Sequence, residues 1–165
     1  MAITKINNNT ISAITALPGA IATGKVLQVV QSTTTTPTST TSTSYADTTL
    51  SGAITPSATS SKILVIVNQD IRTASSSDRT GGSLRLLRGS TVVYSGDAAY
   101  EVFFETGGSN LMQIYLRQNL NYLDSPSSTS ELTYKTQARI YQSGTTITTQ
   151  ESNIEATITL MEIAG

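Results

Sequence analysis

Short apolar stretches separated by polar turns repeat along the chain, and the strongest of them covers residues 62–71. It holds five consecutive apolar residues, mostly β-branched, between polar flanks. Such a run suits a buried strand and is too short for a helix. The pattern therefore predicts a central strand whose five apolar residues are buried on both faces: Ile63, Val65 and Val67 on one, Leu64 and Ile66 on the other.

Residues 132–141 have the cleanest alternation in the chain, which is typical of a strand with one face on the core. The face expected to point inward consists of Leu132, Tyr134, Thr136, Ala138 and Ile140. The opposite face, expected to meet water or another subunit, consists of Thr133, Lys135, Gln137, Arg139 and Tyr141.

Further strands are predicted over shorter or less regular stretches of alternating residues. They cover residues 25–31, 50–54, 98–105, 111–120, 145–150 and 154–163. Residues 111–120 are expected to be buried on both sides. In the last strand the residues expected to point inward are Ile154, Ala156, Ile158 and Leu160. Residues 83–87 and 91–94 flank Arg88-Gly89-Ser90, which predicts a β-hairpin.

Three polar stretches are interpreted as connections. Residues 32–44 are nearly all Ser and Thr, which allows a loop or a Thr-rich edge strand, and we favour the loop. Residues 72–82 end in Gly81-Gly82 and are expected to be a loop, and residues 124–128 form a turn cluster. With about eight to ten antiparallel strands and no long helix, the fold class is all-β, a sandwich or barrel.

A jelly-roll-like β-sandwich is the favoured architecture. Residues 55–62 and 125–131 are similar Pro- and Ser-rich stretches that both precede a long strand. A jelly roll is built of two Greek keys and would produce such an internal sequence repeat. We therefore expect a β-sandwich domain over residues 25–165, preceded by an N-terminal arm or docking segment over residues 1–24.

The composition limits the possible partners and chemistry. Ser and Thr make up roughly 30% of the chain, far above ordinary usage, and only 13% is charged. A net charge of −1, without a basic cluster, indicates neither a nucleic acid nor an anionic membrane as partner. Cys and His are absent, which excludes disulfides, a Ser–His–Asp triad and most zinc sites.

Targeting signals are also missing from the chain. There is no Sec-type signal at the N-terminus and no apolar run of about 18 residues that could span a membrane. We therefore expect no membrane insertion, and a viral or cytoplasmically made product.

No catalytic, cofactor-binding or metal-binding residue is predicted. Three sets of side chains are the nearest candidates for such chemistry. A Ser–Lys pair would have to use one of the lysines, which are interpreted as solvated: Lys5, Lys25, Lys62 and Lys135. Paired carboxylates for glycoside hydrolysis would come from Asp70, Asp78, Asp97, Glu101, Glu105, Asp124, Glu131 and Glu151. Tyrosines that stack on sugars or pack the core are Tyr100, Tyr115, Tyr122, Tyr134 and Tyr141.

Five blocks of sequence, in order, carry a resemblance to a known family. They are residues 24–30 followed by the Ser/Thr tract, 54–65, 86–90, 122–126 and 157–165. Together they resemble small virion proteins of marine tailed bacteriophages, of the cyanophage and pelagiphage type, described as tail-fibre-like or structural. The likeness covers nearly the whole chain. It implies a jelly-roll-like β-sandwich and an oligomer on the particle surface, and it brings no catalytic residues.

Three functions follow as hypotheses. The first is a non-enzymatic structural protein on the virion surface, a capsid decoration or tail-fibre subunit that docks to capsid or tail proteins through residues 1–24. The second is a receptor-binding knob that recognises a host surface glycan. The third, a glycan-degrading enzyme, is least favoured because no acid pair stands out. A homo-oligomer, a trimer, is expected by analogy with viral jelly rolls.

Overall fold

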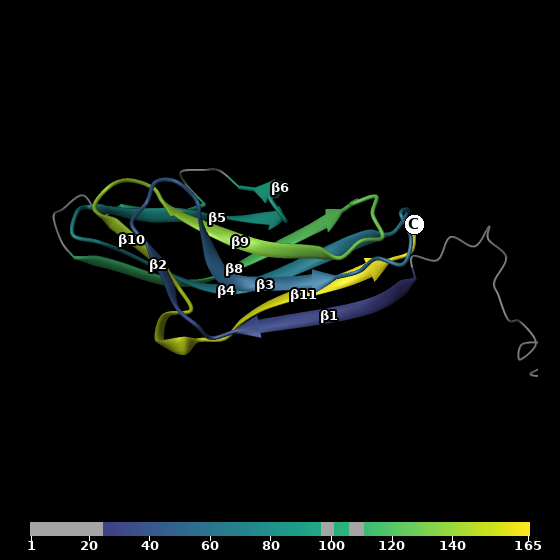
Figure 1. The fold of residues 1–165 in the computed structure, drawn as a ribbon. Helices are drawn as coiled ribbons and strands as arrows, with labels where there is room; N and C mark the ends of the chain where they lie inside the picture. The colour runs from purple at the N-terminus through teal and green to yellow at the C-terminus, as the bar shows by residue number, and fades with distance from the viewer. Residues whose placement is uncertain (1–24, 97–100, 106–110) are drawn as a thin grey trace, which may run out of the picture.

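The computed structural model describes residues 25–96, 101–105 and 111–165, and these form two antiparallel sheets packed face to face (Figure 1). The first sheet, sheet A, contains β1 (Val26–Thr34), β11 (Ala156–Ile163), β4 (Lys62–Ser75), β10 (Thr145–Thr149), β2 (Thr38–Thr40) and β8 (Met112–Asp124). The second, sheet B, contains β3 (Ala46–Ile54), β9 (Leu132–Ile140), β5 (Arg79–Arg88), β6 (Thr91–Ser95) and β7 (Val102–Glu105). The predicted β-sandwich is confirmed, with eleven strands in the described part of the chain.

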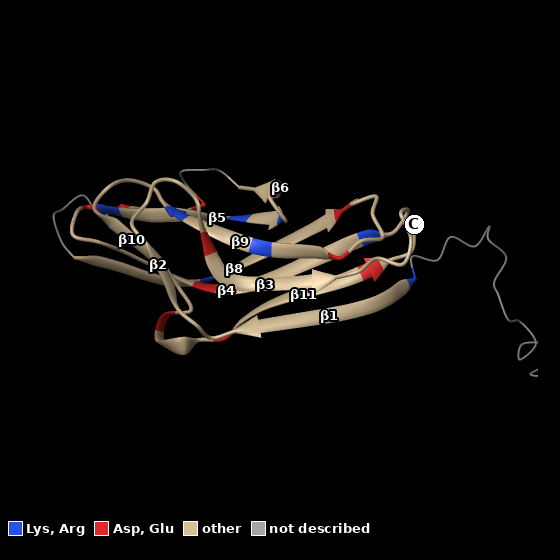
Figure 2. Cartoon of the chain, viewed as in Figure 1, with Lys and Arg blue, Asp and Glu red and all other residues tan. Residues whose placement is uncertain are grey.

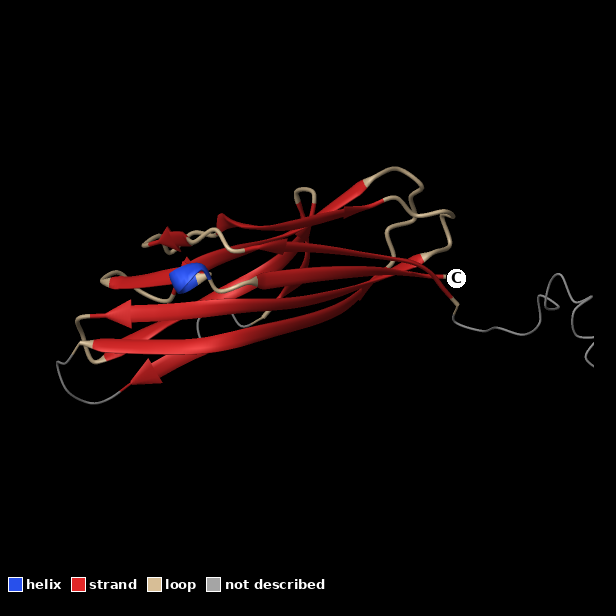
Figure 3. Cartoon of the chain, turned by 90° about the horizontal axis from the view of Figure 1, so that it is seen from below, coloured by secondary structure: helices blue, strands red, loops and turns tan. Residues whose placement is uncertain are grey.

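The strand order is that of a jelly roll. The long strands alternate between the sheets, so that β1, β4, β8 and β11 lie in sheet A while β3, β5 and β9 lie in sheet B. In sheet A the long strands follow the order β1-β11-β4-β8, and β10 pairs with the part of β4 that β11 does not cover. In sheet B the order is β3-β9-β5-β6. The first strand therefore lies beside the last, and Figure 3 shows the long strands running side by side along the sandwich. No described residues form a helix long and apolar enough to cross a membrane.

The core lies between the sheets and uses the inward face of each long strand. In β4, Ile63, Val65 and Val67 are fully buried, as predicted. The alternation of β9 is confirmed as well, because Tyr134, Thr136, Ala138 and Ile140 are buried. The rest of the core comes mainly from Leu50, Ile54, Ile71, Leu84, Leu86, Ile147, Ala156, Ile158 and Leu160.

Both polar stretches interpreted as loops contain strands, which cover about half of residues 32–44 and most of residues 72–82. In residues 32–44, β1 continues to Thr34 and β2 pairs with β10, so a Thr-rich edge strand occupies part of the tract. In residues 72–82, β4 continues to Ser75 and β5 begins at Arg79. The inward side chains Thr73, Ser75 and Thr80 are buried but polar. The sequence therefore shows no alternation of apolar and polar residues that would predict these strands.

Gly81 and Gly82 lie inside β5 and not in a loop, because neighbouring backbone approaches them closely. A Cβ on Gly81 would lie 2.4 Å from the carbonyl oxygen of Val102, and one on Gly82 would lie 2.5 Å from that of Arg139. Real Cβ atoms do not come so close to a carbonyl oxygen. The two glycines therefore mark close backbone approach within a strand.

Three predictions of two-sided or inward burial are wrong. Leu64 and Ile66 are only half-buried, because nothing in the described chain covers the outer face of sheet A. Residues 111–120 lie mostly in β8, which pairs only with β4, so Tyr115 is 58% exposed. Ile154 is 39% exposed because it follows the short helical turn η1 (Glu151–Asn153) and precedes β11.

The predicted hairpin is confirmed, with β5 and β6 joined at Gly89 and Ser90. Gly89 has a φ of 57°, a left-handed conformation that glycine adopts at no steric cost. The predicted strand over residues 98–105 is partly confirmed by β7, while residues 97–100 lie outside the described part of the chain. Residues 1–24 also lie outside it.

A buried carboxylate holds the connection between β3 and β4 against the end of the sandwich. Glu162 of β11 is fully buried, and its Oε1 accepts hydrogen bonds from the Ser57 backbone N (2.7 Å), the Ser57 hydroxyl (2.6 Å) and the Ser61 hydroxyl (2.7 Å). Its Oε2 accepts one from Gln28 Nε2 at 2.6 Å. Burial alone would raise the pKa of Glu162, but these hydrogen bonds outweigh it and hold the pKa at about 2.

Candidate functional site

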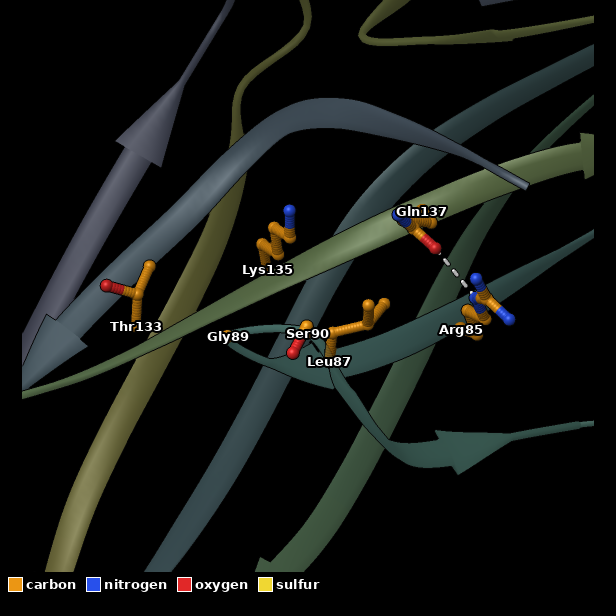
Figure 4. Close-up of a pocket in the computed structure, with 7 residues that line it drawn as sticks. All are labelled: Arg85, Leu87, Gly89, Ser90, Thr133, Lys135 and Gln137. Atoms are coloured by element: carbon orange, nitrogen blue, oxygen red, sulfur yellow. Dashed lines mark hydrogen bonds between the residues drawn. The ribbon is translucent and has the colours of Figure 1, made fainter.

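A shallow hollow of about 500 Å³ lies on the outer face of sheet B, over β5 and β9 and beside the β5–β6 turn (Figure 4). It is lined by Arg85, Leu87, Gly89, Ser90, Thr133, Lys135 and Gln137. The lining follows from strand register, because Arg85 pairs with Gln137 and Leu87 pairs with Lys135, so these side chains share the outward face. The Gly89 backbone N donates to the carbonyl oxygen of Thr133 at 2.8 Å and fastens the turn to β9.

Arg85 is held in a defined position at one end of the hollow. Its Nε donates to Gln137 Oε1 at 2.7 Å, and its guanidinium carbon lies 4.1 Å from the ring centroid of Tyr45. The Arg139 guanidinium carbon lies 5.2 Å from the same ring, so Tyr45 contacts two cations. No carboxylate of the described residues forms an ion pair with Arg85.

Asp47 of β3 orients the other polar groups of the hollow. Its carboxylate accepts a hydrogen bond from Lys135 Nζ at 2.7 Å and one from Gln137 Nε2 at 2.6 Å. These two bonds, that from Lys135 first, lower the pKa of Asp47. The Gln137 amide is thereby fixed with its NH₂ toward Asp47 and its oxygen toward Arg85. Asp47 forms an ion pair with Lys135, whereas it attracts Arg85 without direct contact.

The outer face of sheet B carries several charged side chains, although the protein has few charges overall (Figure 2). Arg85 and Lys135 lie near one acidic side chain, Asp47, and Arg139 contacts Tyr45. The chain as a whole has a net charge of −1. Arg85 and Lys135 outnumber the one carboxylate beside them, so the hollow is locally positive on a protein without a positive net charge.

The lysines do not form a Ser–Lys pair in the described residues. Lys135 lies in the hollow, but its ammonium group donates to Asp47 and not to a serine. Lys25 and Lys62 are exposed near the starts of β1 and β4. Lys5 lies outside the described residues.

Glu101 and Glu105 are not a carboxylate pair, because separate partners hold them. Glu101 accepts from the Leu84 backbone N at 2.9 Å and from Gln118 Nε2 at 3.4 Å, and burial raises its pKa. Glu105 forms an ion pair with Arg79 at 2.8 Å. Neither side chain contributes to the hollow.

Asp124 joins the two sheets at the end of β8. Its carboxylate accepts a hydrogen bond from the Tyr134 hydroxyl at 2.7 Å and forms an ion pair with Arg88. Asp124 and Tyr134 are buried, and burial followed by the nearby Asp124 carboxylate raises the pKa of Tyr134. These contacts describe a structural clasp between β8, β5 and β9.

The remaining candidate carboxylates are dispersed. Asp70 is buried, which raises its pKa, Asp78 lies 3.9 Å from Arg79, Glu131 is exposed, and Glu151 lies 3.7 Å from Arg72. Asp97 lies outside the described residues. In the described part of the chain no three Cys, His, Asp or Glu side chains lie close enough together to hold a metal ion.

The candidate tyrosines are dispersed as well. Tyr134 is in the core, Tyr115 lies under Arg72, Tyr122 packs near Tyr94, and Tyr141 contacts Phe103 edge-on at 5.1 Å. Tyr100 lies outside the described residues. Tyr45, which organises the hollow, was not among the candidates, because it precedes β3 and reaches Arg85 and Arg139 only in the folded sheet.

Fold and site together define the class of this protein as a jelly-roll β-sandwich with a cationic hollow on one outer face. No protein-family model matches the chain, and a search of curated proteins finds no match either.

Proposed function

We propose that the chain is a non-enzymatic structural protein of a bacteriophage virion, a surface decoration or fibre subunit that assembles with copies of itself. The observation that carries this proposal is an apolar row across the outer face of sheet A. Strand register aligns Val29 of β1, Met161 of β11, Leu64 of β4 and Leu123 of β8 side by side. Val29 is 55% exposed and Leu123 is 47% exposed, and contiguous apolar surface of this kind marks an interaction site.

The row lies at the end of the sandwich where residues 1–24 join the domain. The Ala164 backbone N donates to the carbonyl oxygen of Lys25 at 2.9 Å, so the C-terminus lies beside the start of β1 (Figure 1). Val26 and Leu27, also exposed, extend the apolar surface toward that end. An oligomer formed through this row would gather the N-terminal segments of neighbouring copies, which suits joint docking to a capsid or tail protein.

The surface chemistry supports a particle exposed to variable salt. Several polar contacts outside the core join hydroxyl and amide groups without a charge, such as Ser39 with Thr148 and Gln31 with Thr159. Such contacts are less sensitive to ionic strength than ion pairs.

A trimer of 17.4 kDa chains is the expected solution state, and Leu123→Lys should shift it to monomer, because a charge in the row would be desolvated on assembly. Light scattering measures the mass. Val92→Lys, at a 42% exposed position on sheet B, is the matched control and should remain trimeric. A wild-type mass near 17 kDa at micromolar concentration would contradict the proposal.

Location on the particle is tested by gold-labelled antibody against residues 25–165. Label on the surface of intact virions is expected, and its position separates a head decoration from a tail fibre. A chain lacking residues 1–24 should fold but be missing from particles. Intact virions without label would contradict the virion assignment, and an unfolded truncated chain would contradict the docking arm.

The second candidate function is a receptor-binding knob that recognises a host surface glycan. The hollow over β5 and β9 favours it, since a polar concavity with fixed donors suits a small polar ligand.

A further inference from the structure

The hollow contains an arginine, Arg85, that forms no ion pair with a carboxylate of the described residues, although Asp47 lies near enough to attract it electrostatically. Asp47 neutralises Lys135, whereas Arg85 uses only its Nε, toward the neutral Gln137 amide. Packing on Tyr45 and the bond to Gln137 fix the plane of the guanidinium group. Its terminal nitrogens form no hydrogen bond with the described residues, which leaves the forked edge that binds a carboxylate with two parallel hydrogen bonds.

The other lining groups suit a ligand that carries hydroxyls. The Ser90 and Thr133 hydroxyls have no hydrogen-bond partner among the described residues. Thr133 lies at the end of the hollow away from Arg85, and Ser90 lies between them (Figure 4). Leu87 lies at the bottom of the hollow and is 3% exposed, so the accessible lining is polar. A pyranose ring presents several hydroxyls at its rim, and these can bond to such polar groups.

We propose that the hollow binds an acidic saccharide, a sugar that carries a carboxylate. The carboxylate pairs with Arg85, and ring hydroxyls form hydrogen bonds with Ser90 and Thr133. This inference deepens the second proposed function, glycan recognition, and rests on it. Because the net charge of the chain is −1, attraction of the acid depends on this local site and not on the overall field.

The test is an NMR titration of the full, isotope-labelled chain with a trisaccharide of glucuronic acid. Amide shifts are expected at residues 85–90 and 133–137, with affinity that falls as salt rises. A neutral glucose trisaccharide should bind at least about tenfold more weakly, because charge-assisted hydrogen bonds are lost. Arg85→Gln should weaken binding of the acidic trisaccharide by about the same factor. Arg117→Gln removes the same charge from sheet A and should have no effect.

Each contrary outcome has a distinct meaning. Equal binding of the neutral trisaccharide would overturn the acidic assignment and leave glycan recognition standing. Shifts confined to other residues, or an effect of Arg117→Gln equal to that of Arg85→Gln, would overturn the site. Equal shifts and affinity with inorganic sulfate alone would overturn a saccharide in favour of a simple anion site. If thermal unfolding shows that Arg85→Gln does not fold, the wild-type shift map decides the question, because shifts outside residues 85–90 and 133–137 would overturn the site.

Discussion

Val65→Asp is expected to leave the protein unfolded or insoluble. Val65 is fully buried on the inward face of β4, between neighbours on β8 and β11. A carboxylate there would have no charged partner, and burying an unpaired charge costs several kcal/mol. Because total stability is only about 5–15 kcal/mol, the variant should lose its circular dichroism signature or appear in the pellet.

Thr133→Asp introduces the same carboxylate on a strand of the other sheet and serves as the control. Thr133 is exposed at the hollow of sheet B, so the expected cost in unfolding free energy is within about 0.5 kcal/mol. Urea unfolding measures both variants. Equal tolerance at Val65 and Thr133 would contradict the burial of β4, and equal damage would show that the outer face of sheet B is a subunit contact.

Glu162→Gln is expected to lower the free energy of unfolding at pH 7 by about 2–3 kcal/mol, because charge-assisted hydrogen bonds to a buried carboxylate are weakened. The amide NH₂ that replaces one oxygen would also face a donor of Ser57, Ser61 or Gln28. Urea unfolding at several pH values measures the effect.

The pH dependence distinguishes this role from simple packing. The pKa of Glu162 is about 2 in the folded protein and has its ordinary value of 4.5 in the unfolded chain. The stabilisation by its charge is therefore complete above pH 4.5 and lost as the pH falls toward 2. The gap between wild type and Glu162→Gln should close over this window, while the exposed control Glu131→Gln should behave as wild type. A gap that does not change with pH would contradict the ionised network.

Much of the fold could be predicted from the sequence, because burial leaves a pattern wherever the inward residues are apolar. The run around Val65, the alternation in β9 and the hairpin at Gly89 each carry that pattern. The approximate number of strands and the sandwich followed from them. The failures occur where inward positions are polar, as with Thr73 and Thr80, whose burial no hydrophobic pattern records.

The sequence also did not predict which face of each sheet is covered by other strands. Leu64 and Ile66 are as apolar as their inward neighbours, yet they lie on the outer face of sheet A. The apolar stretch around Tyr115 lies in an edge strand. An apolar residue shows that burial is favourable, but only the arrangement of the sheets decides whether anything covers it.

In the candidate site, too, some features follow from the sequence and others only from the tertiary structure. The sequence by itself determined the alternation that turns Thr133, Lys135 and Gln137 outward, because side chains along a strand alternate by geometry. Only the tertiary structure decided that Arg85 pairs with Gln137, and that Tyr45 and Asp47 lie beside them. These contacts join residues tens of positions apart along the chain. They depend on strand register, which is set by packing of the whole jelly roll and leaves no signal in any local stretch of sequence.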